Sequence, residues 1–272
     1  MKKLIASLIL SSILFPLAAQ TADIKVSYDY IHPEQTMKKA VPDIANRYVL
    51  VSNGVISKFY SPETEYVDSI ESTPEGFERF NTFKRICYEK KQQHLIPRQD
   101  GSFYVTKSFA DQRIRTYDVA AGTRFKWEEP LTDIDWEITD STKNILGYEC
   151  FMAMTECHGR KWKVWFAPEI PVHDGPWKLH GCPGLVLEAV CKGEQYRFFA
   201  TGIQQIEKAY YNVYSENSWE SVKGSEFWKL RRECLENPSR NLNSGTNTIV
   251  YQGVEYKKYL PKEIVDYIET DY

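Results

Sequence analysis

The residues of this 272-residue sequence that are best suited to chemistry are histidine and sulfur-bearing side chains in two short segments. The later segment holds His173, Asp174, His180 and Cys182. The earlier one holds Cys150, Met152, Met154, Cys157 and His158. Soft sulfur ligands suit copper, and cysteine with histidine suits zinc. A metal-handling protein, with His173, His180 and Cys182 as ligands, is therefore one function to weigh.

The spacing of these residues argues against a metal centre. Neither segment has a recognised ligand spacing. The segment from Cys150 to Cys157 alternates like a strand, so these two cysteines lie on opposite faces, roughly 20 Å apart along the chain. They cannot share an ion or a disulfide. We therefore expect no metal and no cofactor, and keep copper or zinc handling as the alternative.

Catalytic signatures are weaker still. The sequence holds neither a G-x-S-x-G elbow nor an H-E-x-x-H motif. A Cys182–His180 dyad is conceivable, but cysteine and histidine partners in enzymes usually lie far apart in sequence. We predict no catalytic residues and rank a hydrolase behind metal handling.

Two predicted hairpins must position these residues. In the first, residues 145–157 and 160–167 flank His158-Gly159, a two-residue turn that would set Glu156 opposite Lys161 and Met152 opposite Trp165. In the second, a two-residue turn at Lys192-Gly193 would set Glu188 opposite Arg197.

Both faces of the first predicted hairpin are apolar, whereas a sheet with one wet face alternates apolar with polar residues. Tyr148, Met152 and Trp165 share one of these faces. Either a helix covers that face or the sheet curves around a cavity. With Trp177 from the following segment, these side chains are our candidate ligand-binding residues.

The remaining chain predicts a mainly β (α+β) fold in one domain. Aromatic residues make up 14% of the sequence, which favours strands. Residues 47–60 read as two strands around Asn53-Gly54, and residues 72–85 as a helix or a loop. Residues 218–235 place Phe227, Leu230 and Cys234 at helical spacing, with Ser225 as the cap.

The segment between the hairpins, residues 168–188, reads PEIPVHDGPWKLHGCPGLVLE. Prolines fix φ and glycines accept unusual φ, so we expect a rigid crossing that launches a buried strand, with Trp177 in the core. The residues that define this motif are Gly175, Pro176, Trp177, Gly181, Pro183 and Gly184. We favour a packed corner over a ligand-contacting loop.

This segment resembles the signature of the GLPGLI family of exported proteins, found mainly in Bacteroidetes. The family's name string corresponds to residues 181–186, GCPGLV, with Cys182 where the family usually has leucine. Residues 145–150 and 159–162 resemble the family's hairpin, and residues 49–51 and 57–61 its N-terminal segment. The resemblance covers most of residues 20–272. It implies an envelope protein of a Gram-negative bacterium and no established activity.

The N-terminus predicts export. Met1-Lys2-Lys3 is basic, residues 4–17 are almost wholly apolar, and Ala18-Ala19 offers small residues for a peptidase. We expect residues 1–19 to be a signal peptide and residues 20–272 to form a single GLPGLI-like β-rich domain. The first cysteine is Cys87, so no lipid-modified cysteine follows the cleavage point, and we expect an unlipidated periplasmic protein without a membrane span.

These features together predict a non-catalytic binding or accessory protein of the bacterial envelope. The formal charge of −3 and the missing basic tract argue against nucleic acid as a partner. The expected partner is an apolar small ligand in the concavity of the sheet or an envelope protein. By analogy, we expect a curved antiparallel sheet like the half-barrel of periplasmic lipoprotein carriers, with one or two short helices near the C-terminus.

Overall fold

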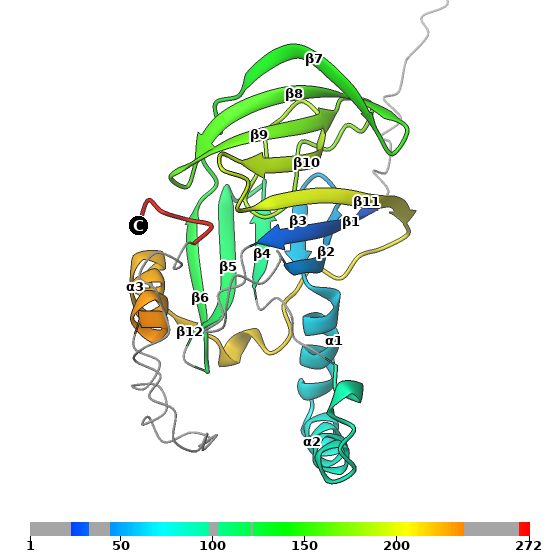
Figure 1. Cartoon of the computed structure of the whole chain (residues 1–272), viewed down its shortest axis with the longest axis vertical. Helices are drawn as coiled ribbons and strands as arrows, with labels where there is room; N and C mark the ends of the chain where they lie inside the picture. Colours follow the sequence, from blue (N-terminus) through cyan, green and yellow to red (C-terminus); the bar gives the residue numbers. More distant parts are fainter. Residues whose placement is uncertain (1–22, 33–43, 98–102, 121, 237–266) are drawn as a thin grey trace, which may run out of the picture.

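The structure is a computed structural model that describes residues 23–32, 44–97, 103–120, 122–236 and 267–272. One strongly curved sheet dominates it, with the strand order β12-β6-β5-β4-β3-β2-β1-β11-β10-β9-β8-β7. Every neighbouring pair is antiparallel except β12 with β6. In Figure 1, β3 to β6 run vertically and β7 to β11 cross above them, so the sheet folds over on itself. The predicted mainly β fold with a curved antiparallel sheet is confirmed.

The strands are β1 (Asp23–His32), β2 (Ile44–Ser52), β3 (Ile56–Tyr60), β4 (Tyr104–Ser108), β5 (Arg113–Ala120), β6 (Thr123–Pro130), β7 (Glu137–Ile145), β8 (Tyr148–Cys157), β9 (Arg160–Ala167), β10 (Leu185–Cys191), β11 (Arg197–Ile206) and β12 (Glu220–Ser221). The helices are α1 (Pro62–Glu71), α2 (Pro74–Glu89) and α3 (Gly224–Glu236), with short 3-10 turns η1 (Gln93–Leu95) and η2 (Glu216–Ser218).

The first predicted hairpin is β8–β9, and its register is confirmed. Met152 pairs with Trp165, and Glu156 pairs with Lys161. His158 and Gly159 have φ of 51° and 73°, so both turn residues are left-handed, as a two-residue type I′ turn requires. Here the turn chemistry alone determined which side chains meet.

The second predicted hairpin, β10–β11, forms in a different register. Glu188 pairs with Phe199 and not with Arg197, which faces Val190. The cause is a longer turn: the Cys191 N–H donates to Tyr196 O, so residues 192–195 form a four-residue loop. Glu194, outside the predicted Lys192-Gly193 turn, takes a left-handed φ of 62°. The shift is two residues, so every side chain keeps its predicted face.

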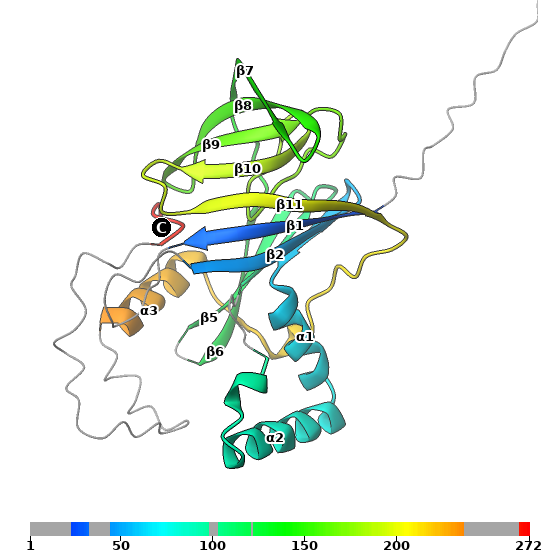
Figure 2. The same ribbon diagram turned by 45° about the vertical axis from the view of Figure 1, so that its right-hand side comes forward.

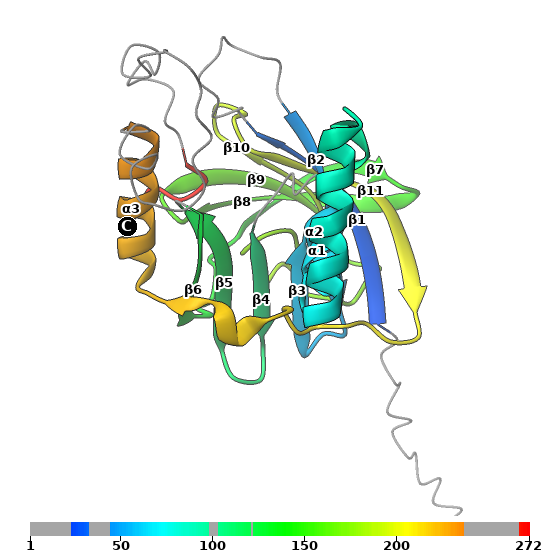
Figure 3. The same cartoon turned by 90° about the horizontal axis from the view of Figure 1, so that it is seen from below.

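Helices lie at two places. α3 occupies the predicted C-terminal helix with Phe227 buried, but it begins at Gly224, so Ser225 is not the cap. Instead the Lys223 N–H donates to the Glu226 carboxylate at 3.2 Å. α2 covers most of residues 72–85, where a helix or a loop was expected, and α1 precedes it; Ser61 and Thr73 cap the two helices. Figure 2 shows this pair projecting from the sheet, away from β7–β10, and Figure 3 views the pair from below.

The proline- and glycine-rich segment fills the concave side of the sheet. Trp177 is 2% exposed, and its ring centroid lies 5.5 Å from that of Trp162 in β9. The predicted core position of Trp177 is therefore confirmed. Asp174 and His180 form an isolated antiparallel bridge, so residues 174–180 fold back as a narrow tongue.

A buried ion pair holds the tongue to the opposite half of the sheet. Lys107 of β4 lies 2.5 Å from Asp174, and both side chains are at most 1% exposed. The same ammonium donates to the carbonyl oxygens of Gly175 and Leu179, at 2.8 and 3.2 Å. The Lys107 ammonium thus has three acceptors, which offset much of the cost of burying it.

No helix in the described ranges is both long and apolar enough to cross a membrane. The predicted signal peptide, residues 1–19, lies outside the described residues.

Candidate functional site

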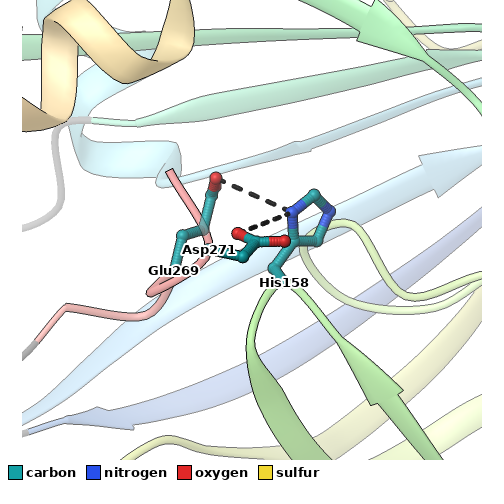
Figure 4. Close-up of side chains that lie close together, drawn as sticks. All are labelled: His158, Glu269 and Asp271. Carbon is teal, nitrogen blue, oxygen red and sulfur yellow. Dashed lines mark ion pairs between the residues drawn. The ribbon is translucent and has the colours of Figure 1, made fainter.

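The densest group of charged side chains around a hollow lies where β6, the β8–β9 turn, the tongue and the C-terminal residues meet. We call it the carboxylate pocket. It has a volume of about 340 Å³. Its acidic, lysine and histidine members are Glu129, His158, Lys178, His180, Glu269 and Asp271. Figure 4 shows His158 with Glu269 and Asp271.

Lys178 is the cation of the carboxylate pocket, and its side chain is fully buried. Its ammonium lies 2.7 Å from Glu269 Oε1 and 2.8 Å from Glu129 Oε1. Burial opposes the charge, but Glu269 and Glu129 outweigh it and hold the pKa of Lys178 above its usual value. Lys178 is therefore a structural cation, not a neutral nucleophile.

His158 faces carboxylates on both sides of its ring. Nε2 lies 3.5 Å from Glu129 Oε1, and Nδ1 lies 3.8 Å from Glu269 Oε2 and 3.9 Å from Asp271 Oδ1. Burial and the neighbouring Lys178 lower the pKa of His158 to about 4. At neutral pH the imidazole is uncharged, so one ring nitrogen offers a lone pair.

The C-terminal residues are fastened to the β8–β9 turn. Thr270 donates its N–H to His158 O at 3.1 Å, and the Arg160 guanidinium donates to the Tyr267 and Ile268 carbonyls. A Cβ at Gly159 would lie only 2.2 Å from Thr270 Oγ1. The glycine thus serves two purposes: it makes the turn, and it admits the segment that carries Glu269 and Asp271.

A second hollow lies over the outer face of β8, β9 and β10. We call it the outer hollow, and its volume is about 700 Å³. Met154, Lys163 and Val190 are cross-strand neighbours at its floor. Charged side chains and one half-buried tryptophan surround them: Asp135, Trp136, Glu137, Glu156, Lys161, Lys192 and Glu194. This combination offers hydrogen-bonding groups of both signs around an apolar floor.

The predicted ligand-binding residues do not form one site. Trp177 lies in the core, whereas Tyr148, Met152 and Trp165 are half-buried on the outer face. Lys143 covers the Trp165 ring at 4.4 Å and pairs with Glu188 at 2.6 Å. Neither hollow is lined by any of the four. Ligand binding by the outer three stays a prediction.

The alternative metal ligands are also separated. His173 is exposed, while His180 and Cys182 are buried. Both His180 ring nitrogens face carbonyl oxygens, of Lys178 at 2.8 Å and Thr132 at 3.1 Å. Burial raises the pKa of the Cys182 thiol to about 12, and this cysteine forms no disulfide. Within the described residues, the metal-compatible group is His158, Glu269 and Asp271.

Sequence analysis missed most of the carboxylate pocket. It treated His158 as a turn residue and gave no role to Glu129, Lys178, Glu269 or Asp271. These residues come from four separate elements, and no local pattern links positions 129 and 269. The one available signal was the lysine inside the apolar tongue, since a lysine at a core position requires carboxylate partners.

Comparison with known proteins gives a consistent fold. The family model described as the N-glycanase peptide N-terminal domain matches residues 85–223, slightly more than half of the chain. Two solved structures, of PNGF-II in the C2 and P21 space groups, each superpose with a TM-score of 0.51, at 13% and 15% identity. Both alignments cover 78% of this chain and 33% of the other.

This chain thus spans about a third of the length of these PNGF-II chains. At such low identity the likeness concerns the fold alone. No curated protein matches this sequence.

Proposed function

Since this chain belongs to the family of N-glycanase N-terminal domains, we propose that it is an exported, non-catalytic binding module of the bacterial envelope that recognises the glycans of glycoproteins. The resemblance to the GLPGLI family, carried by residues 168–188, supports the exported and accessory part of this proposal. The family description supports the choice of ligand.

The observation that carries the proposal is the outer hollow. The inner concavity is filled by Trp177 and the tongue, so a ligand of useful size needs another surface. A hollow of about 700 Å³ falls within the range of ordinary ligand sites. It is also open enough to admit a chain of sugars attached to a bulky protein, which a closed cavity would exclude.

The side chains of the outer hollow match the chemistry of sugars. Sugar hydroxyls donate and accept hydrogen bonds. Lys163 of β9 can donate to them and Glu137 of β7 can accept from them, one on each side of Met154 of β8. The C–H faces of a sugar ring need an apolar partner, which Met154 and Trp136 provide. Hydrogen bonds to charged groups are worth about 1.5–3 kcal/mol each, so a few of them orient a ligand.

Calorimetry with a defined glycopeptide tests the proposal. The probe is a peptide carrying an asparagine-linked oligosaccharide, and its blank is the same peptide without the sugar. We expect only the glycosylated form to bind residues 20–272. Lys163→Ala should weaken that binding about tenfold, the equivalent of one lost charged hydrogen bond.

Lys143→Ala is the matched control, because Lys143 lies on the same outer face but outside the hollow. It should leave the affinity unchanged. If Lys143→Ala or Trp165→Ala abolishes binding while Lys163→Ala does not, the ligand lies on the Tyr148, Met152 and Trp165 patch. Equal binding of both peptides would overturn glycan recognition, and release of the sugar would overturn the non-catalytic assignment.

A further inference from the structure

From the geometry of the carboxylate pocket we propose a divalent-cation site formed by His158 Nδ1, Glu269 and Asp271, whose ion, of the zinc type, fastens the C-terminal segment to the β8–β9 turn. The three ligand atoms all lie within 4.8 Å of one another. Ligands bound about 2.1 Å from one zinc ion are separated by about 3–4 Å, so small side-chain movements suffice.

The orientation of His158 supports a lone pair at Nδ1. Glu129 Oε1 is buried, and the Lys178 ammonium lies 2.8 Å from it, which leaves this oxygen with a further lone pair. It lies 3.5 Å from His158 Nε2, whereas Glu269 and Asp271 lie near the other ring nitrogen, Nδ1. A proton on Nε2 satisfies this oxygen and leaves Nδ1 free, which is the carboxylate–histidine arrangement common behind metal ligands.

The charges of the pocket also leave room for a cation. Glu129, Glu269 and Asp271 are three carboxylates, and Lys178 is the ammonium that pairs with two of them. The three carboxylates and the ammonium together sum to −2, and Glu269 is only 6% exposed. One divalent cation would neutralise the group, which lowers the cost of keeping the carboxylates close together away from water.

The ligand types select the class of ion. An imidazole nitrogen with two carboxylate oxygens suits zinc and related transition ions, whereas calcium prefers six to eight oxygens. His158 belongs to the β8–β9 turn, and Glu269 and Asp271 belong to the C-terminal segment. Binding would therefore join two parts of the chain more than a hundred residues apart.

Direct titration tests the site. Residues 20–272 are stripped with a chelator and titrated with Zn²⁺ by calorimetry, with Ca²⁺ as the hard-ion comparison. We expect one equivalent of Zn²⁺ to bind and Ca²⁺ not to compete. Asp271→Asn should weaken binding at least tenfold. This side chain is half exposed, so the variant should fold.

Two further variants separate the site from the fold. His158→Asn keeps a residue that tolerates the left-handed turn and should lose binding as Asp271→Asn does. Glu156→Gln removes an exposed carboxylate two residues away and should bind normally. Zinc should also slow carboxypeptidase release of Tyr272 in the wild type and not in Asp271→Asn.

Absence of Zn²⁺ binding would overturn the proposal. So would binding that survives both His158→Asn and Asp271→Asn, because the ion would then be held elsewhere. The result does not depend on glycan binding, since the carboxylate pocket and the outer hollow share no residue.

Discussion

At the scale of single residues, the tongue depends on backbone positions that only certain side chains accept. Gly184 has φ of 148°, and a Cβ there would lie 2.3 Å from the Ala167 carbonyl oxygen. This contact is with backbone, which cannot move aside without disturbing β9. His180 carries a different duty, because its buried ring fills space between two carbonyl oxygens.

Gly184→Val should destabilise the protein more than His180→Ala. The valine meets both backbone strain, about 1–3 kcal/mol, and the clash with Ala167. His180→Ala should also cost about 1–3 kcal/mol, because a buried carbonyl group loses the ring N–H that it accepts from and the ring leaves a space behind. Treating His180 as a plain loop residue would predict about 0.5 kcal/mol or less. Thermal melts decide the order, and a larger loss for His180→Ala would show that Gly184 is not the constrained corner.

Stability should fall with pH below about 6.5, in part through His180. Burial and the nearby Lys107 lower the pKa of His180, while Asp174 opposes them. The folded state therefore keeps a neutral imidazole where the unfolded chain takes up a proton, so stability is lost as the pH falls. Urea unfolding at several pH values between 7 and 4.5 gives the free energy of unfolding as a function of pH. This free energy should fall less steeply with decreasing pH for His180→Asn than for the wild type. Identical slopes would contradict the prediction.

At the scale of elements, turns and buried ion pairs determine how segments meet. The β8–β9 turn needed two residues and the β10–β11 turn needed four, so one register followed from sequence and the other did not. The tongue is held to β4 by the Lys107–Asp174 pair, which no turn or strand pattern reveals.

Lys107→Met should cost about 3–5 kcal/mol, because it leaves Asp174 as an uncompensated buried charge. Lys161→Met is the matched control: its partner Glu156 is 4.0 Å away and both are exposed, so the change should be below about 1 kcal/mol. Denaturant unfolding of both variants provides the comparison. Similar losses in the two would mean that the tongue is held by packing alone.

At the scale of the whole molecule, the expectation that remains is export. Protein recovered from the native host should begin at Gln20 or close to it and fractionate with soluble periplasm, because residues 4–17 form an apolar run behind a basic start. N-terminal sequencing of the periplasmic fraction checks this. Finding Met1 on the mature protein would contradict it.

The sequence by itself determined the features that depend on neighbouring residues. Period-two alternation predicted the strands, helical spacing predicted α3, and His158-Gly159 set one register. The proline and glycine pattern predicted the buried corner and the place of Trp177. Each of these follows from local backbone preference or from burial of one face, which a short stretch of chain already encodes.

Only the tertiary structure decided which distant residues share a site. The carboxylate pocket combines Glu129 of β6, Lys178 of the tongue and Glu269 near the C-terminus, and no spacing in the sequence relates them. The fold of the sheet brings β6 and the tongue together, and Gly159 admits the C-terminal residues. Electrostatic interactions depend on distance in space, so these partners meet only when the curved sheet has formed.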